Sequence, residues 1–196
     1  MSATSLRVRK KRETHRALSH AAQELVRQRG LEHVTVDDIA AAGNVSVRTF
    51  FNYFSCKEEA VVGVDEDVLV ELADEIQRRP DGERPIDTLR AVLVDAADAG
   101  MLRRWQLRNE LVSRYPALLP RHLATTVRVE EALARAFAGR GGLDLADNPR
   151  PRIFVAAALA AVRAGLAWWE ESDQATPLVA VIDTALGAVT DLRSDP

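Results

Sequence analysis

The chain has 196 residues, 47% of them hydrophobic and 28% charged, and a formal net charge of −3. This composition is typical of a globular protein and excludes a disordered chain, while the length allows one or two domains with a sizeable core. The single cysteine, Cys56, excludes an intramolecular disulfide and indicates a reduced, cytoplasmic setting.

Positive charge is concentrated at the amino terminus. Residues 1–56 carry nine Lys and Arg against five Asp and Glu, a net of +4, and the remainder carries 17 against 24, a net of −7. The densest segment is RVRKKRETHR, residues 7–16, which includes Arg9, Lys10 and Lys11. A basic arm attracts nucleic-acid phosphates through counterion release, although many basic tails are only solubilising, disordered segments.

The first predicted helix contains an apolar stripe and ends at Gly30, a suitable C-terminal cap. The stripe consists of Leu18, Ala21, Ala22, Leu25 and Val26.

Residues 35–59, TVDDIAAAGNVSVRTFFNYFSCKEE, predict two short helices joined by a tight turn. Thr35 and Asp38 form a capping box for the first, and Ser46 caps the second. Gly43 and Asn44 supply the turn, because both residue types accept left-handed backbone angles.

In the second short helix Phe50 and Phe54, four residues apart, share a buried face. The helix then presents polar side chains outward, namely Ser46, Arg48, Thr49, Asn52 and Tyr53. A helix-turn-helix of this kind inserts its second helix into the DNA major groove; the alternative is an ordinary helical hairpin in an all-α core.

Helical spacing continues to the end of the chain and strand patterns are scarce, so the predicted fold class is all-α. The next predicted helices run from Lys57 to Arg79, from Pro85 to about Ala99, from Met101 to Tyr115, and from Pro120 to near Gly139. The longest predicted loop, GRGGLDLADNPRP, follows them.

Two apolar helices close the chain. Residues 153–169 contain a single charge, Arg163, and are rich in alanine, so we expect burial on nearly every side. A membrane span is the alternative, but the run is shorter than about 18 residues and follows a charged loop. The last predicted helix begins with Thr176 as its cap and Pro177 at its first position.

The segment from about Arg9 to Ala60 resembles the DNA-binding domain of the tetracycline-repressor (TetR) family of bacterial regulators. The matching pieces are RETHRALSHAAQELVRQRG, TVDDIAAAGNVS, RTFFNYF and SCKEEAV. The resemblance implies an all-α homodimer of about nine helices per subunit, with residues 1–56 binding DNA and residues 57–196 binding an effector and forming the dimer.

The resemblance also implies particular DNA contacts. Thr35 and Lys57 match phosphate-contacting positions, and Thr49 matches a position that contacts phosphate or base. Val47 and Arg48 match positions that contact base edges. The family often has Tyr at position 51 and His at position 53. Phe51 cannot donate a hydrogen bond to phosphate, so the hydroxyl of Tyr53 is expected to make this contact instead.

In TetR-like dimers the last two helices of each subunit form an intersubunit four-helix bundle; the alternative is a hairpin within one subunit. The interface residues expected here are Leu159, Val162, Leu166, Leu178, Ile182, Leu186 and Val189.

The residues expected to bind the effector are Trp105, Arg108, Asn109, Phe137 and Trp168, joined by Arg103 and Arg104 for a polar head group. The string MLRRWQLRNELVSRYPAL is similar to mycofactocin-regulator-type members, which suggests an acyl-CoA or another hydrophobic compound. Arginines on a helix are also commonly solvated and aromatic residues commonly belong to the core.

The predicted function is therefore a ligand-responsive regulator, a repressor that binds palindromic operator DNA; the alternatives are an activator or a nonspecific DNA-binding protein. No catalytic group, cofactor loop or metal-ligand spacing of histidines is found, so we expect neither an enzyme nor a membrane protein. A redox role for Cys56 at a helix start is a further alternative.

Overall fold

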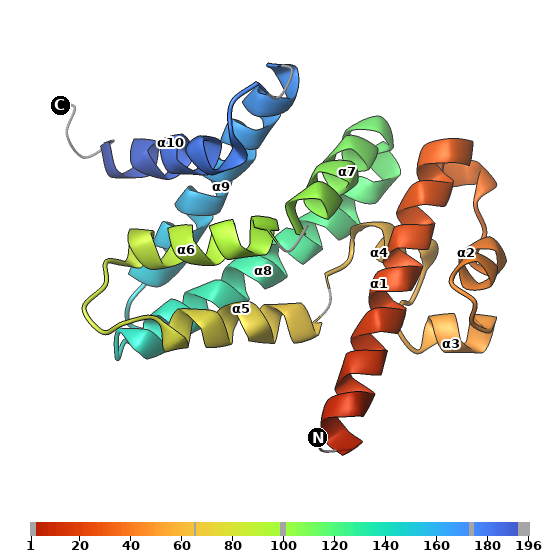
Figure 1. Ribbon diagram of the computed structural model, residues 1–196, viewed down its shortest axis with the longest axis horizontal. Coiled ribbons are helices and arrows are strands. Elements are labelled where there is room, and N and C mark those ends of the chain that lie inside the picture. Colours follow the sequence, from red (N-terminus) through yellow and green to blue (C-terminus); the bar gives the residue numbers. More distant parts are fainter. Residues whose placement is uncertain (1–2, 65, 99–100, 173–174, 192–196) are drawn as a thin grey trace. The chain divides into compact units, whose positions relative to one another are not determined.

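The computed structural model describes residues 3–64, 66–98, 101–172 and 175–191, with side chains for all of these except residues 3–8, 98 and 101–103 (Figure 1). Every regular element among the described residues is helical, which confirms the all-α class. The elements are α1 Ala3–Arg29, η1 Leu31–His33, α2 Val36–Ala42, α3 Val47–Phe51, α4 Lys57–Val62, α5 Glu66–Arg78, α6 Pro85–Asp98, α7 Met101–Arg114, η2 Pro116–Leu118, α8 Leu119–Arg140, α9 Arg150–Glu171 and α10 Leu178–Asp191.

The helices form two compact units. Unit 1 comprises Met1–Val68 and Arg103–Val127, and unit 2 comprises Leu69–Leu102 and Arg128–Pro196. These units are defined by packing, whereas the predicted boundary at residue 56 separates functions and remains a prediction.

In unit 1, α1 extends from Ala3 without a break, so the basic arm is helical. Its predicted stripe is confirmed: Leu18, Ala22 and Val26 are fully buried. Two polar side chains then fasten α1 to α4, because Ser19 Oγ donates to the Ala60 carbonyl over 2.6 Å and Gln23 Nε2 donates to the Val61 carbonyl over 2.8 Å. Gly30, with φ +86°, ends the helix as predicted.

The core of unit 1 joins side chains from α1 to α4, from α7 and from η2. Its buried members are Leu18, Ala22, Val26, Leu31, Val34, Ile39, Ala40, Phe50, Phe54, Ala60, Val61, Val62, Leu111 and Leu118. Because truncating a buried Phe to Ala costs about 3–5 kcal/mol, Phe50 anchors α3 on this core.

The prediction of one helix from Lys57 to Arg79 is wrong. The chain leaves the helical conformation at Gly63, with φ −66° and ψ 155°, and α5 begins at Glu66. A Cβ atom on Gly63 would lie 2.5 Å from the Glu59 carbonyl oxygen, so the break requires glycine. Apolar side chains continue through Val61 and Val62, and helical spacing alone therefore did not reveal the break.

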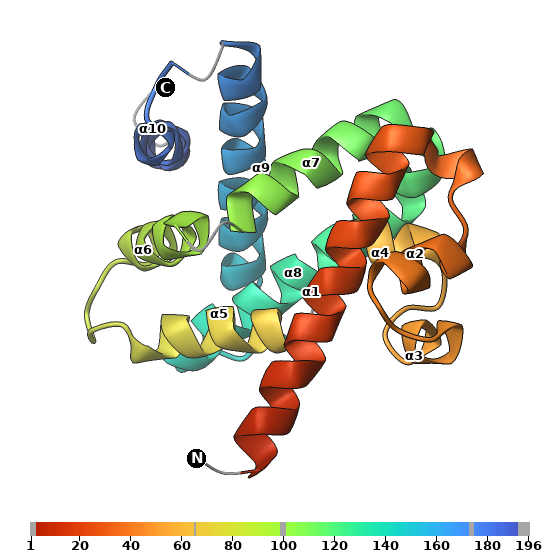
Figure 2. The same cartoon turned by 45° about the vertical axis from the view of Figure 1, so that its right-hand side comes forward.

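In unit 2, α10 packs across α9 and also contacts α6; α6 and α10 lie on the same side of α9 in Figure 2. The buried face of α9 repeats every three or four residues at Val155, Ala158, Val162 and Leu166. A Cβ atom on Gly165 would lie 3.1 Å from the Ala185 Cβ, so glycine allows the two helices to approach closely.

Within the single chain α9 is buried on one face only, and the expected burial on nearly every side remains a prediction. Its opposite face is exposed, and we call this face the α9 stripe. The α9 stripe consists of Ile153, Ala157, Ala160, Ala164, Ala167 and Trp168. By length and composition α9 is also the one described helix that could cross a membrane, a test that core helices of soluble proteins pass as well.

Candidate DNA-binding site

The first short helix, α2, begins with the predicted capping box. Thr35 Oγ1 accepts a hydrogen bond from the Asp38 amide over 3.2 Å, and Asp38 Oδ2 accepts one from the Thr35 amide over 2.9 Å. The Thr35 hydroxyl also donates to Asp38, and these bonds lower the pKa of the Asp38 carboxyl. Thr35 is exposed, so the cap lies at the surface of unit 1.

The turn between α2 and α3 uses its two residues differently. Asn44 has φ +52°, as the left-handed prediction requires, whereas Gly43 has φ −80°. Gly43 is needed for a different reason, because a Cβ atom there would lie 2.7 Å from Leu18 Cδ2 on α1. The turn therefore fixes the distance between the helix-turn-helix and α1.

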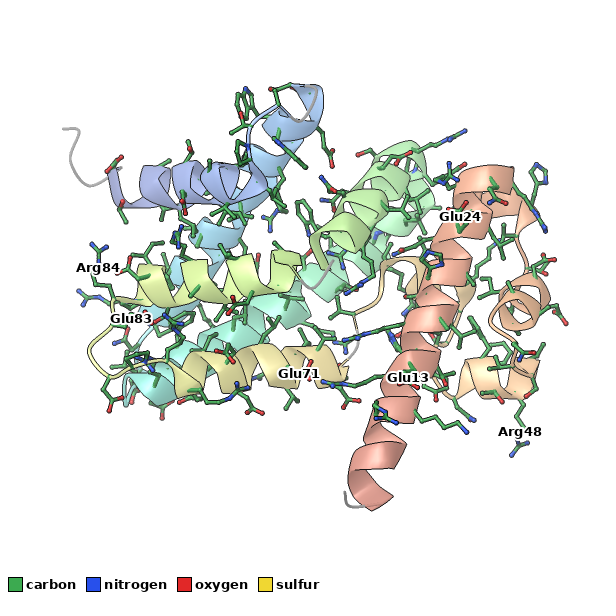
Figure 3. The ribbon with its side chains drawn as sticks, viewed as in Figure 1. Glu13, Glu24, Arg48, Glu71, Glu83 and Arg84 are labelled. Atoms are coloured by element: carbon green, nitrogen blue, oxygen red, sulfur yellow. The ribbon has the colours of Figure 1, made fainter. Side chains whose placement is uncertain are left out.

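Ser46 caps α3 as predicted. Its Oγ accepts from the Thr49 amide over 3.0 Å, and the two hydroxyls are 2.8 Å apart and hydrogen bonded. Phe50 and Phe54 are buried with ring centroids 5.6 Å apart, which turns the opposite face of α3 outward. Arg48 is exposed and extends away from α3 (Figure 3).

The other residues expected on this helix are not equally accessible. Asn52 is exposed, but Val47 and Tyr53 are half-buried and pack against the unit 1 core. The Tyr53 ring lies edge-on to His15, with centroids 6.4 Å apart. Phe51, which the sequence analysis did not list as a contact, is 55% exposed on α3.

Lys57 has a role that the sequence analysis missed. Its Nζ donates to the Leu31 carbonyl over 2.8 Å and to the Val34 carbonyl over 2.9 Å. These carbonyls lie at η1 and just before α2, so the ammonium group ties the start of α4 to the start of the helix-turn-helix. An ammonium group has three donors, and one remains for a phosphate.

The basic arm presents charge along α1. Arg9, Lys10 and Lys11 are exposed, and Arg9 forms an ion pair with Glu13 over 3.5 Å. The Arg7 and Arg103 side chains lie outside the described residues.

The expected effector residues belong to different units. Trp105, Arg108 and Asn109 are half-buried on α7 in unit 1. In unit 2, Phe137 is buried edge-on to Phe154, with centroids 5.2 Å apart, whereas Trp168 is 55% exposed.

The expected interface residues lie mostly inside unit 2. Val162, Leu166, Ile182 and Leu186 are at most 6% exposed, because they form the contact between α9 and α10 of the same chain. Leu159, Leu178 and Val189 are half-buried. The exposed side chains of α9 are instead those of the α9 stripe.

Cys56 is half-buried at the start of α4, and its side chain makes no capping hydrogen bond. Within the described residues, no group of three or more His, Cys, Asp or Glu side chains could hold a metal ion.

Two family models match this chain. Residues 18–61 match the model described as bacterial regulatory proteins, tetR family, and residues 83–193 match the model of the MftR C-terminal domain. A relative, the HTH-type transcriptional regulator TcmR from Streptomyces glaucescens, is 40% identical over 165 residues, which cover 77% of this chain and 70% of TcmR.

Solved structures show the same fold at lower identity. SmeT of Stenotrophomonas maltophilia in complex with triclosan has a TM-score of 0.56 and 19% identity, covering 89% of this chain and 90% of SmeT. FadR of Thermus thermophilus in complex with lauroyl-CoA has a TM-score of 0.54 and 23% identity, covering 90% of this chain and 93% of FadR.

Proposed function

Because this chain belongs to the tetR family of bacterial regulatory proteins, we propose that it is a repressor that binds palindromic operator DNA as a cytoplasmic homodimer and is released by a small effector. Like the other members of its family and its relative TcmR, the chain is a helix-turn-helix transcriptional regulator and not an enzyme.

The observation that carries the DNA-binding proposal is the outer face of α3. Phe50 fixes this helix from the inside while Arg48 and Asn52 stand exposed on the other side. A guanidinium group can bind O6 and N7 of guanine together, and an amide can bind N6 and N7 of adenine. We propose that Arg48 and Asn52 make these base contacts.

Residues around this face would hold the phosphates. Ser46 and Thr49 carry hydroxyls at the start of α3, Thr35 carries one at the start of α2, and Lys57 has one remaining donor. Helix starts favour phosphate through their amide groups and the macrodipole. Phe51 supports an apolar contact, such as one with a thymine methyl group.

Val47 and Tyr53 have less free surface than these residues, so we propose them as edge contacts at most. The exposed Arg9, Lys10 and Lys11 would add sequence-independent attraction along α1.

A second copy of the chain is proposed to cover the α9 stripe. Ile153 is 63% exposed and Trp168 is 55% exposed, and the residues between them are alanines that allow close helix approach. A two-fold dimer places two copies of α3 to meet half-sites separated by one helical turn of DNA, about 34 Å.

The proposed effector is a small hydrophobic or amphipathic molecule. The related folds of SmeT and FadR were solved with triclosan, an apolar ligand, and with lauroyl-CoA, an amphipathic ligand that joins an apolar acyl chain to a charged coenzyme A group. Release requires that the ligand bind one dimer conformation more tightly than the other.

The test is selection of randomised double-stranded DNA by the purified full chain at several salt concentrations. We expect enrichment of a palindrome and an affinity that falls steeply with salt. A nonspecific DNA-binding protein would show the salt effect alone. If no symmetric site is enriched, the proposal is wrong. An activator would enrich the same site, and a reporter with the operator placed over a promoter separates the two roles.

A further inference from the structure

Two arginines of α7 lie in unit 1 without a partner. Arg104 and Arg108 are half-buried, and neither forms a hydrogen bond or an ion pair with any described residue. The Nε atom of Arg108 is fully buried. Several other arginines are paired with carboxylates: Arg79 with Glu83, Arg90 with Asp183 and Arg152 with Glu131.

Helical spacing places both arginines on the face of α7 that packs on the unit 1 core. Arg104, Arg108, Leu111 and Tyr115 follow one another at intervals of four, three and four residues, so they share one face. Leu111 is fully buried and Tyr115 packs against the same core, which includes Leu18 and Ala22 of α1. The arginines therefore lie beside α1.

Both arginines are partly removed from water, and Arg104 also has a positively charged neighbour. Burial lowers the pKa of Arg104, and the positive charge of Arg16 on α1 lowers it further. Burial alone lowers the pKa of Arg108 to about 10. Removing a guanidinium group from water without a carboxylate partner costs free energy. Acidic side chains are not scarce in this part of the chain, because residues 57–196 contain more acidic than basic residues.

We infer that Arg104 and Arg108 form a binding site for the anionic head group, a carboxylate or a phosphate, of the effector. This inference rests on the proposed function and specifies the chemistry of the ligand. Residues four apart on a helix have Cβ atoms about 5–6 Å apart, so both guanidinium groups can reach one head group. Each can bind two oxygen atoms at once through its planar fork of donors.

The position of the site beside α1 would allow a bound anion to affect the helix-turn-helix through packing. A bound anion would remove the repulsion between Arg16 and Arg104 and so change the packing of α7 against α1. Helix α1 also fixes α4, through Ser19 and Gln23, and contacts the turn residue Gly43. A shift at this contact would alter the support of the helix-turn-helix.

Calorimetry on the full chain tests the site with three probes: sodium laurate, sodium pyrophosphate and neutral dodecanol. We expect the wild type to bind at least one anionic probe, and Arg104→Met with Arg108→Met to weaken that binding at least tenfold, because each bidentate pair is lost. Arg121→Met, at an exposed arginine of the same unit, should change it less than twofold. Binding of laurate alone assigns a carboxylate, and binding of pyrophosphate alone assigns a phosphate.

Two outcomes would contradict the inference. Either neither anionic probe binds the wild type, or the arginine substitutions weaken the binding of dodecanol as strongly as the binding of the anions. A second measurement is the melting temperature without ligand. Removing an unpaired buried charge should raise it by about 2 °C or more for Arg108→Met. Arg108→Lys, which keeps the charge, should melt like the wild type and still bind the anion more weakly. A lower melting temperature for Arg108→Met would show internal stabilising contacts and contradict the inference.

Operator binding without any probe separates this inference from the proposed function. Arg108→Met, which leaves the repulsion between Arg16 and Arg104 in place, should bind the selected palindrome within twofold of the wild type. If this variant loses operator affinity but keeps probe binding, Arg108 belongs to the DNA interface and the inference fails. If the wild type selects no palindrome, the proposed function fails, while the calorimetry still decides whether the anion site exists.

Discussion

At the scale of single residues, the contacts that hold the helix-turn-helix are of two kinds. The caps at Thr35 and Ser46 join residues three apart, and the sequence alone predicts them. The bonds from Lys57 to the Leu31 and Val34 carbonyls span 26 and 23 residues. No local pattern indicates such a contact, because it exists only after α1 and α4 pack together.

Arg48 tests the base contact. Arg48→Ala should relax the preference at one base pair in each half-site, with a loss of about 1–3 kcal/mol of discrimination, and should leave the fold intact because the side chain is exposed. Selection on randomised duplexes measures this change. Lys11→Ala is the matched control, since it should weaken all sequences alike. An unchanged preferred site in Arg48→Ala contradicts the assignment.

Lys57 tests a structural contact. Lys57→Met should lower the free energy of unfolding by about 1.5–3 kcal/mol, because two hydrogen bonds from a charged donor are lost. Denaturation in urea measures the effect. Lys10→Met, which removes an exposed lysine, should change stability by less than about 0.5 kcal/mol. Equal stability of the two variants would leave Lys57 with a role in DNA binding only.

Glu83 tests the pH dependence of the turn between α5 and α6. Its carboxylate pairs with Arg79 over 2.5 Å and accepts from Thr88 Oγ1 over 2.8 Å, and these bonds lower its pKa to about 2 (Figure 3). A lowered pKa in the folded state stabilises the fold above the ordinary value of about 4.3, and this stabilisation is lost as the pH falls towards 2.

The melting temperature of Glu83→Gln should therefore lie below that of the wild type at pH 6, and the gap should close between about pH 4.5 and pH 2. Hydrogen bonds from Arg27 and Gln28 also lower the pKa of Glu24 to about 2. Glu24 is present in both proteins, so its contribution to the pH dependence cancels in the comparison. A gap that is constant with pH would show that Glu83 acts through packing and not through its charge.

At the scale of elements, apolar spacing and turn residues predict most helices to within a few residues, including α6, α7 and α8. They fail between Lys57 and Arg79, because apolar side chains continue through the break and glycine alone marks it. They also leave the buried face of α9 undefined. Alanine occurs on all sides of that helix, so the face that meets α10 cannot be separated from the exposed face.

Gly63 tests the break. Gly63→Ala should destabilise the protein by about 1–3 kcal/mol, because the added Cβ would lie 2.5 Å from a backbone carbonyl oxygen that cannot move aside. Gly187→Ala is the control: nothing lies within 4 Å of its Cβ position inside α10, so the same substitution should be neutral or stabilising. Chemical denaturation compares them, and equal effects would exclude steric conflict at Gly63.

At the scale of the whole molecule, the α9 stripe is the surface proposed to join two subunits. Ala164→Glu places a charge in its middle and should give a monomer with an unchanged circular dichroism spectrum and weak operator binding. Ile182→Asp, at a position 1% exposed, should unfold unit 2 instead of releasing an intact monomer, because it buries an unpaired charge.

Sedimentation measures the mass of each variant, with Ala124→Glu on an exposed site of α8 as the control for an added charge. A dimer that persists in Ala164→Glu would remove the α9 stripe from the proposed interface. Helical spacing predicts the two helices at the end of the chain but not the exposed side chains of the α9 stripe, since only packing within the chain decides which apolar residues remain at the surface.

The proposed dimerisation through the α9 stripe would make operator binding depend on the concentration of this regulator. When unpaired subunits predominate, the amount of paired protein grows with the square of the total, by mass action. Occupancy of a symmetric site then changes more sharply than the number of copies in the cell. The proposed dimer should also melt at a lower temperature after dilution, because dissociation removes the stabilisation that the second subunit provides.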